Sequence, residues 1–212
     1  MKTMFKTKAI VALAIVAMMC MGSCNSGPGK KMKEVREKTK QATDLVKSIS
    51  NLEKDAADAT DTMDKLKTLE PFDNDRFQSW MPERLGEMKR ESYQFSSNMG
   101  NTGTLLFVNE DYSKTVELNI IDGAGEAGSL VYASQTFMTG MVTNHFLESD
   151  EKLEKLVTRK GNKAIETYYK KTNDSEIQGI IDNRFIVFAK AKDTDINELW
   201  GYIDKLNISK LK

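Results

Sequence analysis

Cysteine and histidine are almost absent from this sequence of 212 residues, which contains two cysteines and one histidine. Both cysteines, Cys20 and Cys24, lie in the first 24 residues, so the rest of the chain has no thiol for a disulfide or a Cys-His catalytic pair. A single histidine, His145, excludes multi-histidine metal sites, and no serine occupies a G-x-S-x-G motif. We therefore expect His145 to be a surface or helix-end residue, and we predict no catalytic, cofactor-binding or metal-binding residue.

The first 24 residues have the pattern of an export signal. The opening MKTMFKTK contains three lysines and no acidic residue, and an apolar run follows over residues 9–21. A basic start followed by about 13 apolar residues is typical of a secretory signal and is too short to span a bilayer stably. Gly22 and Ser23 directly precede Cys24, so the stretch resembles the lipobox of bacterial lipoproteins, with Met21 where such motifs usually carry leucine.

This resemblance implies that residues 1–23 are a signal peptide and that Cys24 becomes the acylated first residue of the mature chain. Fatty acids such as palmitate would then anchor the protein, and the three acyl chains typical of this class hold a protein firmly to a membrane. Cys20 is the weaker candidate because two bulky methionines precede it. Asn25, rather than an aspartate, follows Cys24, which in the sorting rule of Gram-negative lipoproteins favours the outer membrane over the inner one. The body is then expected to face the periplasm.

An excess of one charge is also missing, since 31 basic residues balance 31 acidic ones. Cleavage before Cys24 removes three lysines and no acidic residue, which leaves 28 basic against 31 acidic residues and a net charge of −3. A domain with this charge is a poor match for the polyanionic backbone of nucleic acids. We therefore predict no nucleic-acid partner.

Residues 24–29 form a short polar segment that we interpret as a lipidated flexible tether, and residues 30–70 have the pattern of a long helix. Residues 30–40 contain six basic and two acidic residues, which suit either a solvated helix start or anionic lipid headgroups. No proline or glycine interrupts residues 30–70, so a helix of about 40 residues would be roughly 60 Å long. Pro71 is expected to end it.

Apolar residues repeat every seven positions in this segment, as in the seam of a coiled coil. Alanine and methionine occupy several of these positions and specify a partner poorly. Three interpretations stay open: a self-associating coiled coil, a helix that packs on its own domain or stands as a stalk, and a seam for another protein. The two series of apolar residues are Val35, Ala42, Ile49, Ala56 and Met63, and Leu45, Leu52, Ala59 and Leu66.

Residues 71–212 are predicted to form an α+β domain. Apolar and polar residues alternate around residues 93–95 and 116–120, residues 105–108 are a short apolar run, and four further strands are predicted at 153–158, 164–169, 176–181 and 184–190. The short loops at 160–162, 173–174 and 182–183 contain residues that tolerate positive φ, which favours antiparallel hairpins. We predict an antiparallel sheet of about six or seven strands, with helices at about 126–141 and 195–206 covering one face.

Gly123, Gly125 and Gly128 have the G-x-G-x-x-G spacing of dinucleotide-binding loops. Such a loop joins a buried parallel strand to a helix, whereas residues 116–120 alternate as half-exposed antiparallel strands do. The carboxylate of Asp122 would also lie beside the pyrophosphate. We therefore interpret the glycines as a packing turn that brings a helix close to the sheet, and we predict no nucleotide cofactor.

Asp193, Asp195, Asn197 and Asp204 loosely imitate the spacing of a calcium loop. Position six of that loop is Glu198, where the tight turn requires glycine. We therefore prefer Thr194 or Asp195 as the N-cap of the last helix.

Two classes of function stay open. The first is a noncatalytic envelope lipoprotein that binds a partner or has a structural role, with the membrane as one partner and a protein or a second copy bound through residues 30–70. The alternative is a hydrolase of envelope polymers that uses two carboxylates. Two buried carboxylates in a cleft would favour the hydrolase, and a filled sandwich of sheet and helices would favour the binding module.

Overall fold

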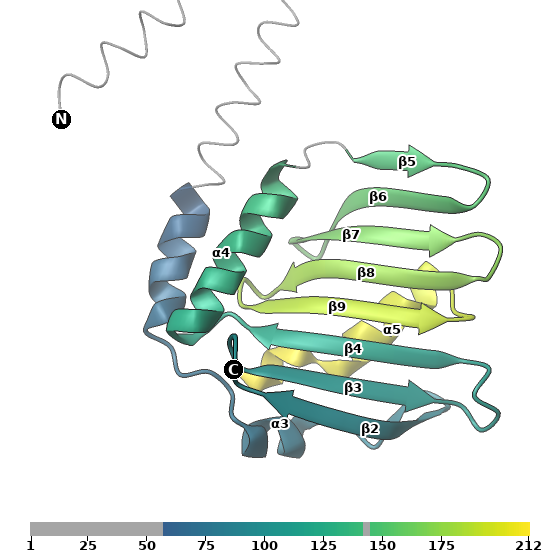
Figure 1. Cartoon of the computed structure of the whole chain (residues 1–212), viewed down its shortest axis with the longest axis horizontal. Coiled ribbons are helices and arrows are strands. Elements are labelled where there is room, and N and C mark those ends of the chain that lie inside the picture. The colour runs from purple at the N-terminus through teal and green to yellow at the C-terminus, as the bar shows by residue number, and fades with distance from the viewer. Residues whose placement is uncertain (1–56, 142–144) are drawn as a thin grey trace, which may run out of the picture. The chain divides into compact units, whose positions relative to one another are not determined.

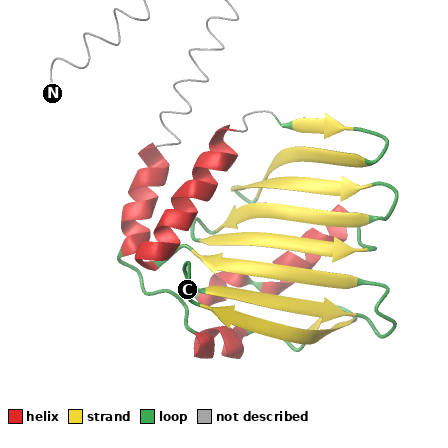
Figure 2. Ribbon diagram, in the orientation of Figure 1, coloured by secondary structure: helices red, strands yellow, loops and turns green. Residues whose placement is uncertain are grey.

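Nine antiparallel strands form one sheet in the computed structural model, which describes residues 57–141 and 145–212 (Figures 1 and 2). The strands are β1 (Arg84–Leu85), β2 (Met88–Ser96), β3 (Thr102–Val108), β4 (Thr115–Asp122), β5 (Phe146–Glu148), β6 (Lys152–Arg159), β7 (Asn162–Tyr169), β8 (Asp174–Ile181) and β9 (Phe185–Lys192). Their order across the sheet is β1-β2-β3-β4-β9-β8-β7-β6-β5. The predicted α+β class and the antiparallel sheet are thus confirmed.

Helices precede, interrupt and follow the strands. They are the helix over residues 57–67, α3 (Asn74–Trp80), α4 (Gly125–Met141), α5 (Ile196–Leu206) and a final 3₁₀ turn, η1 (Ile208–Leu211). The predicted helices at 126–141 and 195–206 are confirmed as α4 and α5. Among the described residues, none of these helices has the length and apolar character needed to cross a bilayer.

Two meanders build the sheet. Strands β1 to β4 form the first and β5 to β9 the second, and β4 pairs with β9 at the centre. The connections of the second meander turn tightly because four of their residues have positive φ, as predicted for these loops. They are Lys160, Asn173, Asp182 and Asn183. Short loops of this kind leave neighbouring strands no arrangement except an antiparallel one.

The larger core lies between the sheet and α5. Val116, Leu118 and Ile120 of β4 are completely buried on this face, whereas Glu117 between them is exposed on the other. Alternation along the strand therefore places every second residue in this core. Helix α5 contributes one apolar face, which consists of Leu199, Trp200, Tyr202, Ile203 and Leu206.

A smaller core lies on the opposite face, where α4 and helix 57–67 pack. Leu66 and Tyr132, one from each helix, meet Ile186 of β9, and all three are buried. The prediction that the helices cover one face is therefore wrong. The central strands allow packing on both sides because β9 has apolar residues at consecutive positions, Ile186 facing the helix pair and Val187 facing α5.

The predicted strand number of six or seven is also too low. Strand β1 has two residues and β5 has three, so neither is long enough to show an alternating pattern. Helix α3 is not predicted for a similar reason. Only one of its seven residues, Phe77, is buried, so the sequence shows no apolar period there.

The long helix predicted over 30–70 is described only from residue 57 onward, and residues 30–56 lie outside the described part of the chain. Its described part ends at residue 67 rather than 70. The amides of Thr68 and Leu69 donate to the carbonyls of Lys65 and Leu66, three residues back, which tightens and closes the last turn before Pro71.

A buried ion pair joins the segments that meet at the end of β4. Asp122 is fully buried, and its carboxylate accepts two hydrogen bonds from the guanidinium of Arg184, from Nε at 2.7 Å and from Nη2 at 2.8 Å. The amides of Phe72 and Ala124 donate to the same carboxylate at 2.8 and 2.9 Å. Arg184 Nη2 also donates to the carbonyl of Glu70 at 3.0 Å. One carboxylate therefore holds three segments that are far apart in the sequence.

The glycines after Asp122 form a packing turn, as predicted. Gly125 has a φ of +74°, a conformation that side chains rarely adopt. A Cβ on Gly123 would lie 2.5 Å from the carbonyl oxygen of Arg184, and one on Gly128 would overlap the backbone of Asp122. These three positions let α4 begin directly beside the buried ion pair.

Gly125→Ala is expected to lower the free energy of unfolding by more than about 1 kcal/mol, because alanine is strained at positive φ. Gly140 is the matched control in the same helix, since its φ is not positive and no atom lies within 4 Å of the position that a Cβ would take. Gly140→Ala should leave stability unchanged or raise it by up to about 1 kcal/mol. Urea unfolding of both variants measures the difference, and equal effects would contradict the packing-turn interpretation.

Candidate functional site

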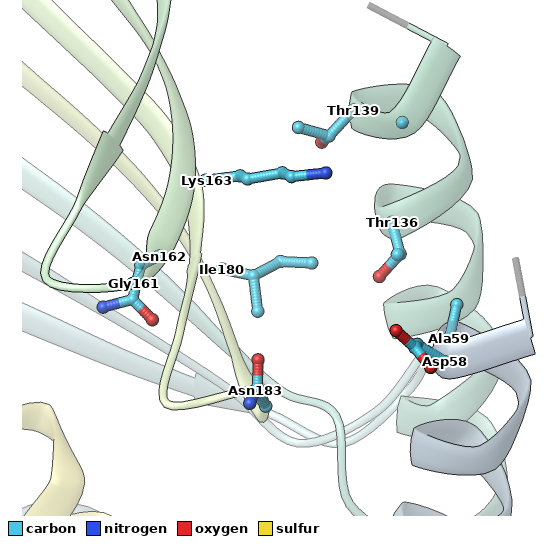
Figure 3. Close-up of a pocket in the computed structure, with 10 residues that line it drawn as sticks. Asp58, Ala59, Thr136, Thr139, Gly161, Asn162, Lys163, Ile180 and Asn183 are labelled. Carbon is cyan, nitrogen blue, oxygen red and sulfur yellow. The ribbon is translucent and has the colours of Figure 1, made fainter. Parts of the chain in front are cut away.

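A cleft opens between the helix pair and the sheet, on the face opposite α5 (Figure 3). It has a volume of about 170 Å³. Helix 57–67, α4, the ends of β7 and β8 and the turns beside them all contribute to its wall. The lining residues are Asp58, Ala59, Thr136, Thr139, Gly140, Gly161, Asn162, Lys163, Ile180 and Asn183.

The side chains of this cleft point toward one another from opposite walls. Figure 3 shows Thr136 and Thr139 extending from α4 toward Lys163 of β7 and Ile180 of β8. Behind the cleft, Gln135 joins the helix to the sheet, because its Oε1 accepts a hydrogen bond of 3.1 Å from Gln178 Nε2. This contact connects the two walls of the cleft.

Its chemistry suits holding a ligand rather than attacking one. The hydroxyls of Thr136 and Thr139 donate to the carbonyls of Tyr132 and Gln135, at 2.9 and 2.8 Å, so their protons are engaged within the helix. The described lining contains one carboxylate, from Asp58, and neither serine nor histidine. A nucleophile needs an adjacent base within hydrogen-bond reach, and this lining does not provide the pair.

His145 lies beside the edge of the sheet, directly before β5. Its side chain is 31% exposed, and Nε2 contacts the Oε1 atom of Glu154. Lys152 donates to the other carboxylate oxygen of Glu154 at 2.8 Å. These contacts hold the pKa of Glu154 below its ordinary value, the Lys152 hydrogen bond contributing most. His145 is thus partly buried at the sheet edge and is not at a helix end, and its partner Glu154 belongs to an ion-pair cluster on β6.

The residues of the calcium-like spacing separate in the structure. Asp195 is the N-cap of α5, and its Oδ1 accepts hydrogen bonds from the amides of Asn197 and Glu198 at 2.8 and 3.0 Å. Asp193 accepts a hydrogen bond from Asn173, and Asp204 lies in the last turn of α5. The preferred N-cap interpretation is confirmed for Asp195. Within the described ranges, no three His, Cys, Asp or Glu side chains converge as a metal site.

A second hollow of about 210 Å³ lies on the α5 side of the sheet. Both basic residues of its lining pair with Asp204, which contacts Lys160 at 2.9 Å and Arg159 at 3.5 Å, and Arg159 lies over the ring of Trp200. The indole of Trp200 donates to buried Glu166 at 2.6 Å. These contacts stabilise the packing of α5 on the sheet and leave this hollow less suited to a ligand than the first.

The two most buried carboxylates of the described chain, Asp122 and Glu166, lie far apart. They are on β4 and β7, with β9 and β8 between them, so three strand spacings separate them, or about 14 Å. Paired carboxylates of glycoside hydrolases lie about 5 to 9.5 Å apart. Each is also bound by other groups, Asp122 by Arg184 and Glu166 by Trp200 and Lys155. This arrangement does not resemble the two-carboxylate site that the hydrolase alternative requires.

The glycine turn is flanked by antiparallel strands, since β4 is antiparallel to both β3 and β9. A dinucleotide loop follows a parallel strand and leaves the helix N-terminus open to phosphate. Here the carboxylate of Asp122 already accepts a hydrogen bond from the Ala124 amide at the start of α4. The chain's own anion therefore lies where a phosphate would bind.

Comparison with known proteins adds no family to this description. No protein-family model, no curated protein and no solved structure that was compared with the chain matches it.

ATP, NAD and FAD are predicted to leave the melting temperature of the protein unchanged, because Asp122 occupies the anion position at the start of α4. A bound ligand at 100 times its dissociation constant would add about 2.7 kcal/mol of stability and would be visible in a thermal-shift assay. A saturable shift that Gly125→Ala abolishes would show that the loop binds phosphate after all.

Proposed function

We propose that the protein is a lipid-anchored module of the cell envelope that binds a protein partner and has no catalytic activity of its own. The observation that carries the proposal is the pattern of residues 1–24, in which a basic start and an apolar run lead to Gly22, Ser23 and Cys24. Acylated Cys24 would be the membrane anchor, with Asn25 favouring the outer membrane and the body in the periplasm.

The open part of the sheet supports the binding role. Helix α4 and helix 57–67 lie toward one end of their face, and the strands beyond them are uncovered in Figure 1. Partly exposed Leu106, Ile165 and Phe188 share this face with polar side chains, and Glu117 and Lys190 lie exposed on neighbouring strands. A broad, rigid surface that mixes apolar and charged groups suits a protein partner better than a small molecule.

The cleft and the buried carboxylates support a noncatalytic role. Asp122 and Glu166 are held apart by three strand spacings, and the threonine hydroxyls of the cleft are engaged by their own helix. The cleft of Figure 3 would then be a subsite that accepts one small group of the partner.

Cys24→Ser is expected to release the protein from the membrane fraction or to stall its processing, because serine cannot carry the thioether lipid. Cys20→Ser is the matched control and should change neither. Fractionation of cells, with the size of the chain read on a gel, measures both outcomes. A Cys24→Ser chain that is fully processed and membrane-bound would disprove the anchor.

A photo-crosslinking residue in place of Glu117 or Lys190, on the open face, is expected to form an adduct in intact cells. The same residue in place of Lys205, exposed on α5, is the control and should form none. Mass spectrometry identifies the captured protein. Equal labelling from both faces, or labelling from α5 alone, would contradict the assignment of the sheet face as the binding surface.

A further inference from the structure

Helix α4 presents a row of apolar side chains to solvent. Leu130, Phe137 and Met138 are 59%, 65% and 61% exposed. Their spacings of seven and eight residues place them on one side of the helix. We name these three residues the α4 stripe.

The outer side of this helix is more apolar than that of an ordinary surface helix. Its side toward the sheet carries polar Ser129, Gln135 and Thr139 as well as Val131 and Tyr132 of the smaller core, while the apolar side chains of the α4 stripe face outward. Glu126 is the one charged residue among its 17, and the exposed positions from 127 to 138 carry no charge. A helix exposed only to water would have its polar residues outside, so the α4 stripe indicates a contact surface.

The α4 stripe lies beside the point where the chain from the proposed anchor joins the body. Asp58 and Ala59, at the start of helix 57–67, line the same cleft as Thr136 and Thr139, which flank Phe137 and Met138 in α4. The tether from Cys24 therefore joins the described body on the side that carries α4.

We propose that the α4 stripe docks on the surface of the bilayer that holds the anchor. This inference rests on the proposed function, because only an anchored body stays next to a bilayer. The exposed area distinguishes a bilayer from a second copy: three side chains of roughly 200 Å² each, about 60% exposed, present roughly 360 Å², whereas stable interfaces bury about 800 Å² per partner. Uncharged phenylalanine, leucine and methionine side chains insert into the interfacial region of a bilayer without a shaped partner.

Vesicle binding of the full mature-length chain with Cys24→Ser tests the proposal without the acyl group. The vesicles contain phosphatidylethanolamine and phosphatidylglycerol, and about 0.5 M salt suppresses the contribution of the basic segment 30–40. Phe137→Trp should show a blue-shifted emission with vesicles and quenching by brominated acyl chains, above the background of Trp80 and Trp200. Tyr112→Trp, at an exposed position on the β3–β4 loop, should show neither.

Flotation with the same vesicles gives the second measurement. The double variant Phe137→Gln, Met138→Gln should bind at least about tenfold more weakly. The matched pair Tyr93→Gln, Tyr112→Gln removes exposed apolar groups elsewhere and should bind as the parent does. All four side chains are at least 43% exposed, so the fold should persist in both variants, with circular dichroism as the check.

Two results would overturn the proposal. The first is unchanged flotation of the Phe137 and Met138 variant together with unmoved emission of Phe137→Trp. The second is a concentration-dependent dimer, formed without vesicles and lost in the same variant, which would make the α4 stripe an interface between copies. Since these chains are not acylated, failure of the anchor prediction at Cys24 would leave both measurements readable.

Discussion

The ion pair between Asp122 and Arg184 is the contact on which the arrangement of the domain depends. It joins residues 62 positions apart and is buried, and its charges are compensated by each other and by the backbone groups of Glu70, Phe72 and Ala124. Removing one partner of a buried pair typically costs about 3 to 5 kcal/mol, because the remaining charge stays uncompensated. The same carboxylate binds the start of α4, the end of β4 and the segment before α3, so one side chain joins these three segments.

The position of α4 then determines the surfaces that the protein offers. Because the glycine turn brings the helix directly onto the sheet, Val131 and Tyr132 reach the smaller core, and Gln135 reaches Gln178. Three large apolar residues of the helix, Leu130, Phe137 and Met138, are left on its outer side, and the cleft lies between the helix and the sheet. The cleft, the open strands and the α4 stripe therefore all follow from the way α4 packs on the sheet.

The sequence alone predicts those helices and strands that have a clear local pattern, such as apolar periodicity or turn residues. Helix α5 is predictable from its apolar periodicity and its Asp195 cap, and the hairpins of residues 152–192 from turn residues that adopt positive φ. The short strands β1 and β5 carry no period, and the assignment of helices to faces depends on strand pairing rather than on any local pattern. From the sequence, the carboxylate of Asp122 can be predicted to disfavour phosphate binding. Its ion-pair partner Arg184 cannot be predicted, because that requires the register between β4 and β9. Thr136 and Thr139 of the cleft look like ordinary helix residues until the sheet beneath them is known.

The pairing of β4 with β9 has a consequence for how the chain reaches this structure. The central ladder joins residues 115–122 to residues 185–192, so the middle of the sheet closes only after the last strand has been made. Contacts between residues so distant in sequence close large loops, and proteins rich in them fold slowly. Until β9 is made, β4 has one unpaired edge, and such an edge is a template for pairing with other chains. Under the proposed export of the unfolded chain, the edge that stays unpaired longest would be the one in the middle of the future sheet, and this topology would then require protection of that edge until β9 has crossed the membrane.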